Sequence, residues 1–147
     1  MPDAPDSLNA VCPHCEAVNR IPSARRDEHP VCGRCGRELF TGASVTLSTA
    51  AWDRFTVRND LPVVVDFWAK WCGPCRAMAP AFEAAARALE PAFRLVKVNT
   101  EEASALAARL GIRSIPTLAL FKGGAEVRRS AGAMDTPGIV AWARQGR

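Results

Sequence analysis

Six cysteines dominate the chemistry available to this 147-residue chain, and all of them fall into Cys-x-x-Cys pairs. The pairs are Cys12/Cys15, Cys32/Cys35 and Cys72/Cys75. The N-terminal segment, MPDAPDSLNA, is acidic and has no apolar core, which argues against a secretory signal peptide and predicts a cytoplasmic protein. Because the cytoplasm is reducing, we expect the pairs to bind metal or to perform redox chemistry rather than to form structural disulfides.

The first two pairs are separated by sixteen residues, a spacing typical of four-thiolate zinc sites. Each pair can form a tight turn that brings two sulfurs to one metal at about 2.3 Å, and Gly33 and Gly36 are expected to supply the positive φ of such turns. Four protein ligands leave no open position, so we predict one structural zinc. Its ligands would be Cys12, Cys15, Cys32 and Cys35. Two disulfides or an iron site remain the alternatives, and His14 and His29 are interpreted as solvent-exposed loop residues.

The third pair lies in the segment WCGPC at residues 71–75, where an apolar strand is predicted to end and a helix to begin. A thiol at a helix N-terminus faces unpaired amides and the positive end of the helix dipole, which favour the thiolate. We therefore predict that Cys72 is the exposed nucleophile and that Cys75, one turn into the helix, resolves the mixed disulfide. Pro74 stiffens the bridge between them. A third metal knuckle would need two further ligands, which the neighbouring sequence lacks.

The chain divides into two parts, residues 1–43 and residues 44–147. The first part has too few large apolar residues to fold unaided, so it needs a metal to hold it together. The second part follows a βαβαβαββα pattern, which predicts a mixed α/β sheet. Strands are expected at 45–47, 63–68, 93–99, 117–121 and 126–130, and helices at 50–58 (capped by Ser48 or Thr49), 72–90, 101–110 and from a Thr136 cap onward.

Asp66 lies inside the apolar run VVVDFW at residues 63–68, which is typical of a strand covered on both faces. An unpaired ionised carboxylate in such a strand costs several kcal/mol, so burial should raise its pKa. A purely structural aspartate with a buried partner is the alternative interpretation.

The segments FWAKWCGPC at 67–75 and IPT at 115–117 resemble the thioredoxin family, and the likeness runs from about residue 45 to 145. The preceding cysteine module resembles that of the thioredoxin-2 type. The resemblance implies a thioredoxin fold, a mixed central sheet flanked by helices, with a small N-terminal zinc-ribbon-like module. It also implies that Asp66 exchanges protons with Cys75. The further site residues that it implies are Lys97, which would approach Asp66, Trp71, Gly73 and Pro74 around the dithiol, and Ile115 with a cis Pro116, which would present backbone to an extended substrate.

The function implied by the resemblance is that of a protein-disulfide reductase. Thioredoxin reductase would deliver electrons from NADPH, oxidised target proteins would be the other partners, and no organic cofactor would be bound. A redox-sensing zinc module, in which metal release controls partner binding, is the alternative. Gly-Pro between the cysteines disfavours an oxidant or isomerase. The formal net charge is +4, but the lysines and arginines form no basic stripe interleaved with aromatic residues. This distribution argues against nucleic-acid binding. No apolar stretch approaches a membrane span, and we expect a monomer.

Overall fold

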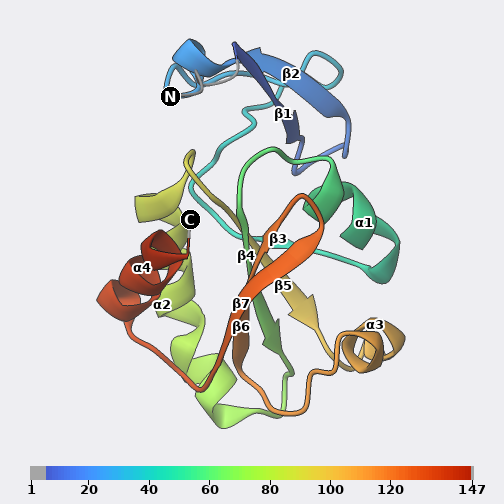
Figure 1. The fold of residues 1–147 in the computed structure, drawn as a ribbon, viewed down its shortest axis with the longest axis vertical. Coiled ribbons are helices and arrows are strands. Elements are labelled where there is room, and N and C mark those ends of the chain that lie inside the picture. Colours follow the sequence, from blue (N-terminus) through green and yellow to red (C-terminus); the bar gives the residue numbers. More distant parts are fainter. Residues whose placement is uncertain (1–5, 147) are drawn as a thin grey trace.

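The computed structural model describes residues 6–146 of the chain (Figure 1). Its strands are β1 (Ser7–Val11), β2 (Val18–Pro22), β3 (Val45–Thr46), β4 (Val63–Trp68), β5 (Arg94–Asn99), β6 (Thr117–Lys122) and β7 (Ala125–Ala131). Its helices are the short 3-10 helix η1 (Ser23–Arg25), α1 (Thr49–Val57), α2 (Gly73–Leu89), α3 (Ser104–Arg109) and α4 (Thr136–Gln145). Within the described residues, no helix combines the length and the apolar character that crossing a membrane requires.

The main sheet has five strands in the order β3-β5-β4-β6-β7. The strands β3, β5 and β4 run parallel to one another, whereas β6 pairs antiparallel with β4 and β7 pairs antiparallel with β6. The sheet is therefore mixed, as the βαβαβαββα pattern predicted. The hairpin between β6 and β7 turns at Gly123 and Gly124, which both have positive φ.

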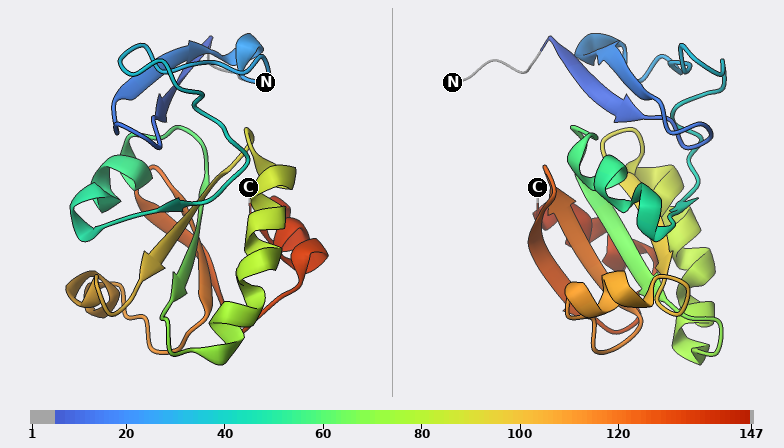
Figure 2. Two further views of the ribbon diagram at one scale, coloured as in Figure 1. Left: turned by 180° about the vertical axis from the view of Figure 1, so that it is seen from behind. Right: turned by 90° about the vertical axis from the view of Figure 1, so that its right-hand side faces the viewer.

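Helices cover both faces of this sheet and make a three-layer structure (Figure 2). On one face, Trp52 and Phe55 of α1 and Leu106 of α3 pack with inward residues of the sheet. On the other face, α2 and α4 pack over a second apolar cluster. The continuous apolar run of β4 is thus buried on both sides, as its composition predicted.

The alternation of side chains along β4 decides where Asp66 points. Val65 and Phe67 belong to the cluster under α1 and α3, whereas Val64 belongs to the cluster under α2 and α4. Since successive side chains of a strand point to opposite faces, Asp66 shares the face of Val64 and points toward α2. Its neighbours in the register are Lys97 on β5 and Leu118 on β6.

The observed helix starts agree with the predicted ones in part. Ser48 caps α1, because its side chain accepts a hydrogen bond from the backbone N–H of Ala51. The prediction for α4 was wrong, since its cap is Asp135, whose carboxylate accepts from the N–H of Gly138 at 2.9 Å. The hydroxyl of Thr136 instead donates to the carbonyl of Ala81.

The start of α3 also differs from the prediction, because the helix begins at Ser104 and not at Glu101. The side-chain oxygen of Asn99 accepts from the N–H groups of Glu101 and Glu102 and holds residues 101–103 in turns. The side chain of Asn99 therefore caps the turns that precede the regular helix.

The N-terminal segment forms an antiparallel hairpin of β1 and β2, which the sequence analysis did not predict. A small separate core contains Leu8, Ala10, Ile21 and Leu39, together with the cysteines Cys12 and Cys32. Leu61 of the following domain completes this core, while Val11 of β1 packs into the main core. Each part of the chain thus contributes an apolar side chain to the core of the other.

Candidate active site and metal centre

Cys72 and Cys75 form a disulfide at the start of α2, with their Cα atoms 5.3 Å apart. Cys72 is the N-cap of the helix, and its sulfur accepts a hydrogen bond from the backbone N–H of Cys75 at 3.2 Å. Gly73 and Pro74 occupy the first two helical positions. The helix N-terminus therefore directs a backbone donor at the first sulfur, an arrangement that stabilises a thiolate there once the disulfide is reduced.

The expected exposure of Cys72 is not found in the disulfide form. Cys72 is 4% exposed and Cys75 is 2% exposed, so both residues are buried. The backbone of Ile115 covers the first cysteine, since its carbonyl oxygen lies 3.8 Å from the Cys72 sulfur. The difference between the two cysteines lies in their positions on the helix and not in their exposed surface.

The loop before β6 supplies the second wall of the site. The Ile115–Pro116 bond is cis, as the resemblance implied, and the N–H of Gly132 donates to the carbonyl of Pro116. Trp71 is 67% exposed beside this loop. A shallow cavity of about 190 Å³ is lined by Trp71, Thr100, Ile112, Arg113, Ser114 and Ile115. A concave surface with both apolar and polar side chains therefore lies beside the disulfide.

Asp66 is fully buried, and neither of its carboxylate oxygens has a hydrogen-bond partner among the described residues. Burial raises the pKa of this carboxyl to about 7. Lys97, which lies opposite in the register, lowers the pKa in part, and Glu83 on α2 raises it. The Lys97 ammonium lies 4.6 Å from the ring centroid of Trp68. The carboxyl can consequently hold or release a proton near neutral pH.

The four N-terminal cysteines converge, with all their sulfurs within 4.8 Å of one another. The sulfurs of Cys12 and Cys35 are 3.6 Å apart, and those of Cys15 and Cys32 are also 3.6 Å apart. A tetrahedral site with metal–sulfur bonds of about 2.3 Å has edges of roughly 3.8 Å, whereas a disulfide needs about 2.05 Å. The observed cluster of free thiols therefore fits a four-thiolate metal site and not two disulfides.

The two turns that carry these cysteines repeat the same hydrogen bonds. In each turn, the backbone N–H of the first cysteine donates to the carbonyl of the residue five positions later. The carbonyl of the same cysteine accepts from the N–H of the residue four positions later. Glu16 and Gly36 follow the second cysteine of each turn and have φ of 64° and 77°. Gly36 thus has the expected conformation, whereas Gly33 does not have positive φ. The N–H of Gly33 instead donates to the side chain of Asn19.

Asn19 is a neighbour of the cysteine cluster that the sequence analysis missed. Its side-chain N–H lies 3.4 Å from the sulfur of Cys32, and its carbonyl oxygen binds the N–H of Gly33 at 2.9 Å. The backbone amide of Cys35 and this side-chain amide lower the pKa of the Cys32 thiol to about 6. An asparagine on β2 carries no local pattern that would mark it as a neighbour of the sulfurs.

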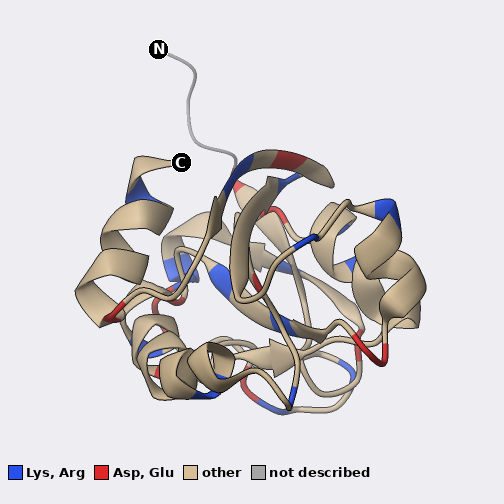
Figure 3. Ribbon diagram, turned by 90° about the horizontal axis from the view of Figure 1, so that it is seen from below, with Lys and Arg blue, Asp and Glu red and all other residues tan. Residues whose placement is uncertain are grey.

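The dithiol and the cysteine cluster lie at opposite ends of the main sheet (Figure 1). The ribbon of β1 and β2 lies beside the start of β4, while Cys72 follows its end. A strand of six residues spans about 20 Å, so direct exchange between the two sets of sulfurs within one chain is excluded. Figure 3 views the dithiol end of the molecule and shows Lys and Arg dispersed among Asp and Glu.

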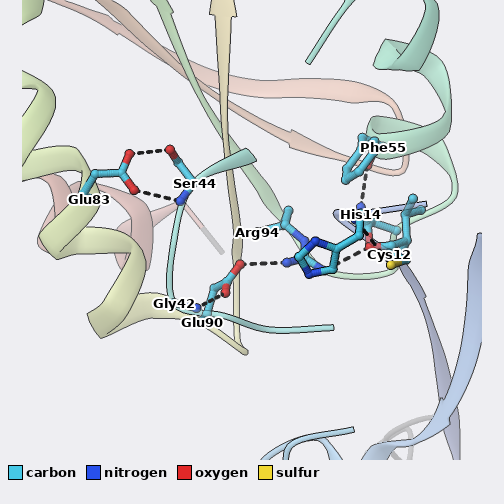
Figure 4. A network of polar contacts seen from close by, with 10 residues as sticks. Cys12, His14, Gly42, Ser44, Phe55, Glu83, Glu90 and Arg94 are labelled. Carbon is cyan, nitrogen blue, oxygen red and sulfur yellow. Dashed lines mark hydrogen bonds and ion pairs between the residues drawn. The ribbon is translucent and has the colours of Figure 1, made fainter. Parts of the chain in front are cut away.

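Arg94 joins the ribbon to the main sheet, and the sequence analysis missed it as well. This side chain is fully buried at the start of β5. It forms an ion pair with Glu90 at 2.8 Å (Figure 4). It also donates to the carbonyl of Val11 at 3.1 Å and lies 4.8 Å from the ring centroid of Phe40. Because Val11 precedes Cys12, this buried cation holds the backbone next to a cysteine of the cluster.

The chain was compared with families and proteins of known type. The model of the family Thioredoxin matches residues 43–145, and the model of the family described as Thioredoxin 2, N-terminal, a zinc ribbon, matches residues 11–37. A protein from Corynebacterium nephridii named Thioredoxin C-3 is 39% identical over 135 residues, which cover 92% of each chain. A thioredoxin from Porphyra purpurea is 47% identical over 88 residues, 60% of this chain and 82% of the relative.

A solved structure is also similar. It is a mutant thioredoxin from Halobacterium salinarum NRC-1, with a TM-score of 0.65 and 30% sequence identity, covering 71% of this chain and 91% of that one. The matched families, the relatives and the disulfide at the start of α2 agree with one another. The chain therefore belongs to the thioredoxin family, carries the N-terminal ribbon of the thioredoxin-2 type, and is a thiol-disulfide oxidoreductase.

Proposed function

We propose that the chain is a protein-disulfide reductase that works through the Trp-Cys-Gly-Pro-Cys dithiol. The observation that carries this proposal is the position of the dithiol. Cys72 caps α2 beside the backbone of Ile115, and Asp66 faces the same helix from beneath. A nucleophile, a backbone edge for an extended target and a buried proton acceptor are thus gathered at one end of the sheet.

The proposed reaction has two exchange steps. The Cys72 thiolate attacks one sulfur of a target disulfide, which forms a mixed disulfide and expels the other target sulfur as a thiolate. Cys75 then gives its proton to Asp66 and attacks the Cys72 sulfur, which releases the second target sulfur and leaves the Cys72–Cys75 disulfide. The target gains two electrons and the dithiol loses two. Thioredoxin reductase restores the dithiol with electrons from NADPH, and no organic cofactor is bound.

The surface around the dithiol has a proposed supporting role. Trp71 is exposed beside the shallow cavity, and Ile115 and Pro116 present backbone to an extended target. Gly73 and Pro74 keep the dithiol compact at the helix start. Lys97 faces Asp66 and favours its ionised form when the proton has to leave the site again.

The ribbon is proposed to have a structural role through one zinc ion. Its ligands would be Cys12, Cys15, Cys32 and Cys35. Bound there, zinc supplies four bonds that hold the two turns together, and its closed ligand set leaves no position for a substrate. The proposed domain boundary falls between residues 43 and 44. Because free thiols persist in a reducing compartment, we place the protein in the cytoplasm. We also propose that it is a monomer.

Insulin reduction with thioredoxin reductase and NADPH tests the proposed activity. The Cys72→Ser variant should lose turnover, because no nucleophile remains. The Cys75→Ser variant should attack a target once and stay attached to it, so that a mixed disulfide is isolated on a non-reducing gel. Appreciable turnover by Cys72→Ser would refute the assignment.

The exposure of Cys35 supports a second candidate, a redox sensor in the ribbon. Two-electron oxidation of a ribbon thiolate pair by a peroxide would form a disulfide, break the metal site and uncover a partner-binding surface. Exchanging the cysteines of the ribbon and of the dithiol in separate variants distinguishes the two functions. Insulin reduction should follow the dithiol alone, whereas a sensor's partner binding would follow the ribbon.

A further inference from the structure

Ser44 holds a carboxylate of the main helix with two hydrogen bonds. The backbone N–H of Ser44 donates to Oε1 of Glu83 at 2.9 Å, and its hydroxyl donates to Oε2 (Figure 4). Among the described residues, no Lys or Arg forms an ion pair with Glu83. Within residues 6–146, this half-buried charge therefore has its hydrogen-bond partner in the residue directly before β3, at the junction with the ribbon.

This carboxylate belongs to the layer that contains Asp66. In the register, Asp66 lies opposite Lys97, and Lys97 lies opposite Thr46 on β3. Glu83 is bonded to Ser44, which lies two residues before Thr46, so its carboxylate is held at the β3 edge of the sheet. Two carboxyl groups, Glu83 and Asp66, thus lie on the α2 side of the sheet near one ammonium group, Lys97.

Among the residues that the structure describes, the charged groups that act on Asp66 come from β5 and α2. On β5 the facing group is Lys97, on α2 it is Glu83, and on β6 the opposite residue is the apolar Leu118. From α4, the side chains in this layer are apolar. Burial raises the pKa of Asp66 most, Lys97 opposes this effect, and Glu83 reinforces it. The Glu83 charge therefore acts against Lys97 in setting the proton affinity of Asp66.

We propose that Ser44 and Glu83 are positioning residues of the reductase: Ser44 fixes the Glu83 carboxylate on the Asp66–Lys97 layer, and this charge keeps Asp66 basic enough to take the proton of Cys75. The inference rests on the proposed role of Asp66 in the resolving step. In that step the proton moves from the Cys75 sulfur to an Asp66 oxygen, and a more basic carboxylate is a better acceptor.

The first test is a ¹³C NMR titration of the Asp66 carboxyl in the oxidised, zinc-loaded full chain, where Cys75 does not titrate. Glu83→Gln should lower the titration midpoint of Asp66, on the order of half a pH unit for the loss of one nearby like charge. Ser44→Ala keeps all charges but frees one oxygen of Glu83, so the midpoint should fall by less. Glu102→Gln removes an exposed carboxylate after β5 and is the matched control, with no change expected.

The second test is the pH profile of insulin reduction by the same variants. In Glu83→Gln the acid limb of the profile should move to lower pH together with the Asp66 midpoint, and the plateau rate should fall roughly twofold, with KM for insulin unchanged. If Glu83→Gln does not fold, Ser44→Ala decides the question, because it alters the position of the charge without removing it.

The outcomes separate the inference from the proposed function. An Asp66 midpoint in Glu83→Gln equal to that in Glu102→Gln overturns the inference, while Asp66→Asn still tests the role of Asp66 in the reaction. A midpoint that moves while the pH profile stays in place refutes the role of Asp66, and the inference falls with it.

Discussion

At the scale of single residues, the thioredoxin chemistry depends on groups whose ordinary behaviour is changed by their surroundings. Cys72 gains a backbone donor from the helix N-terminus, and Asp66 lacks any hydrogen-bond partner among the described residues. The first environment favours an ion and the second disfavours one. The protein accepts an unfavourable buried carboxyl because a group that titrates near pH 7 can exchange protons with a thiol.

Asp66→Asn should stabilise the oxidised protein, and the gain should depend on pH. The unfolded-state pKa is near 3.8 and the folded-state pKa is about 7, so between these values the folded protein keeps a proton that the unfolded chain has released. The free energy of unfolding of the native sequence therefore falls as pH rises through this window, and the loss is complete above about pH 7. The variant should gain up to about 4 kcal/mol at pH 8 and almost nothing at pH 4.

Urea denaturation of both proteins across this pH range measures the difference. Because both proteins carry the same metal site, effects of acid on the ribbon cancel between them. A gain that does not vary with pH would show that Asp66 is ionised or protonated throughout, and thus that its pKa is not near neutral. Thiol-exchange rates, measured alongside, should fall in the variant because the proton acceptor is lost.

At the scale of elements, the helix caps and strand ends determine where the active-site residues lie. The long helix α2 starts at the dithiol, and β4 leads directly into it, so the positions of both cysteines follow from one strand–helix junction. The last helix, α4, packs against α2 and covers the other side of the same cluster. The residue that caps α4 therefore helps to stabilise the apolar cluster on the Asp66 side of the sheet.

Asp135→Ala should lower the free energy of unfolding by about 1 kcal/mol, because the N–H of Gly138 loses its cap. Thr136→Ala is the matched variant, since its hydroxyl makes only a 3.4 Å contact with the Ala81 carbonyl. Denaturation midpoints compare the two. A larger loss for Thr136→Ala than for Asp135→Ala would contradict the assignment of the cap.

At the scale of the whole molecule, the ribbon and the main domain are joined by buried polar contacts as well as by apolar packing. The N–H of Val11 binds the side chain of Asn59, its carbonyl binds Arg94, and Glu90 accepts from both Arg94 and the N–H of Gly42. These contacts surround the backbone next to Cys12. The stability of the metal site should therefore depend on residues of the main domain.

Arg94→Met should destabilise the protein by about 3–5 kcal/mol, because it leaves the buried Glu90 carboxylate without its cation. It should also speed the loss of zinc to a chelator, since the Val11 carbonyl loses its donor. The double variant Glu90→Gln/Arg94→Met removes both charges and should recover much of the stability. Arg129→Met is the control, because Arg129 likewise pairs with a carboxylate, Glu126, and donates to backbone carbonyls, but is partly exposed. It should cost about 1 kcal/mol or less.

Thermal unfolding and chelator kinetics provide the two measurements. Equal losses in Arg94→Met and Arg129→Met would mean that the buried pair contributes no more than a surface pair. Unchanged zinc release in Arg94→Met would show that this contact does not reach the metal site.

Removal of zinc should unfold the ribbon while the main domain stays folded. The ribbon core is small, so metal binding must supply its folding free energy, on the order of 10 kcal/mol at neutral pH. All four tryptophans lie after residue 47, so their fluorescence reports the main domain alone. Fluorescence should persist after chelation while proteolysis cuts the ribbon, and metal analysis should find one zinc per reduced chain.

A chain truncated to residues 44–147 extends this test. It should fold and reduce insulin, with its free energy of unfolding lowered by about 2–4 kcal/mol, because Leu61 and the neighbouring apolar surface become exposed. An unfolded or inert truncated chain would mean that the two parts fold as one unit, and a reduced full chain without zinc would refute the four-thiolate site.

The spacing of the cysteines and the periodicity of the apolar residues were sufficient to predict one metal site and one redox site, and the order of strands and helices after residue 43. These features are local: a Cys-x-x-Cys turn, an apolar run such as VVVDFW and a Ser cap act within a few residues, so the sequence displays them directly. The resemblance in WCGPC and IPT added the thioredoxin fold and the cis Pro116, which no local pattern indicates.

Only the tertiary structure decided which distant residues meet. Asn19 reaches Cys32, Ser44 reaches Glu83, and Arg94 reaches Val11 across 83 positions of sequence. The cap at Asp135 and the start of α3 depend on bonds within three residues, where neighbouring polar side chains offer alternative caps. The covering of Cys72 by Ile115, in contrast, joins residues that only folding brings together. A polar side chain takes the donor or acceptor that folding places beside it, and because that partner is distant in the chain, sequence spacing cannot identify it.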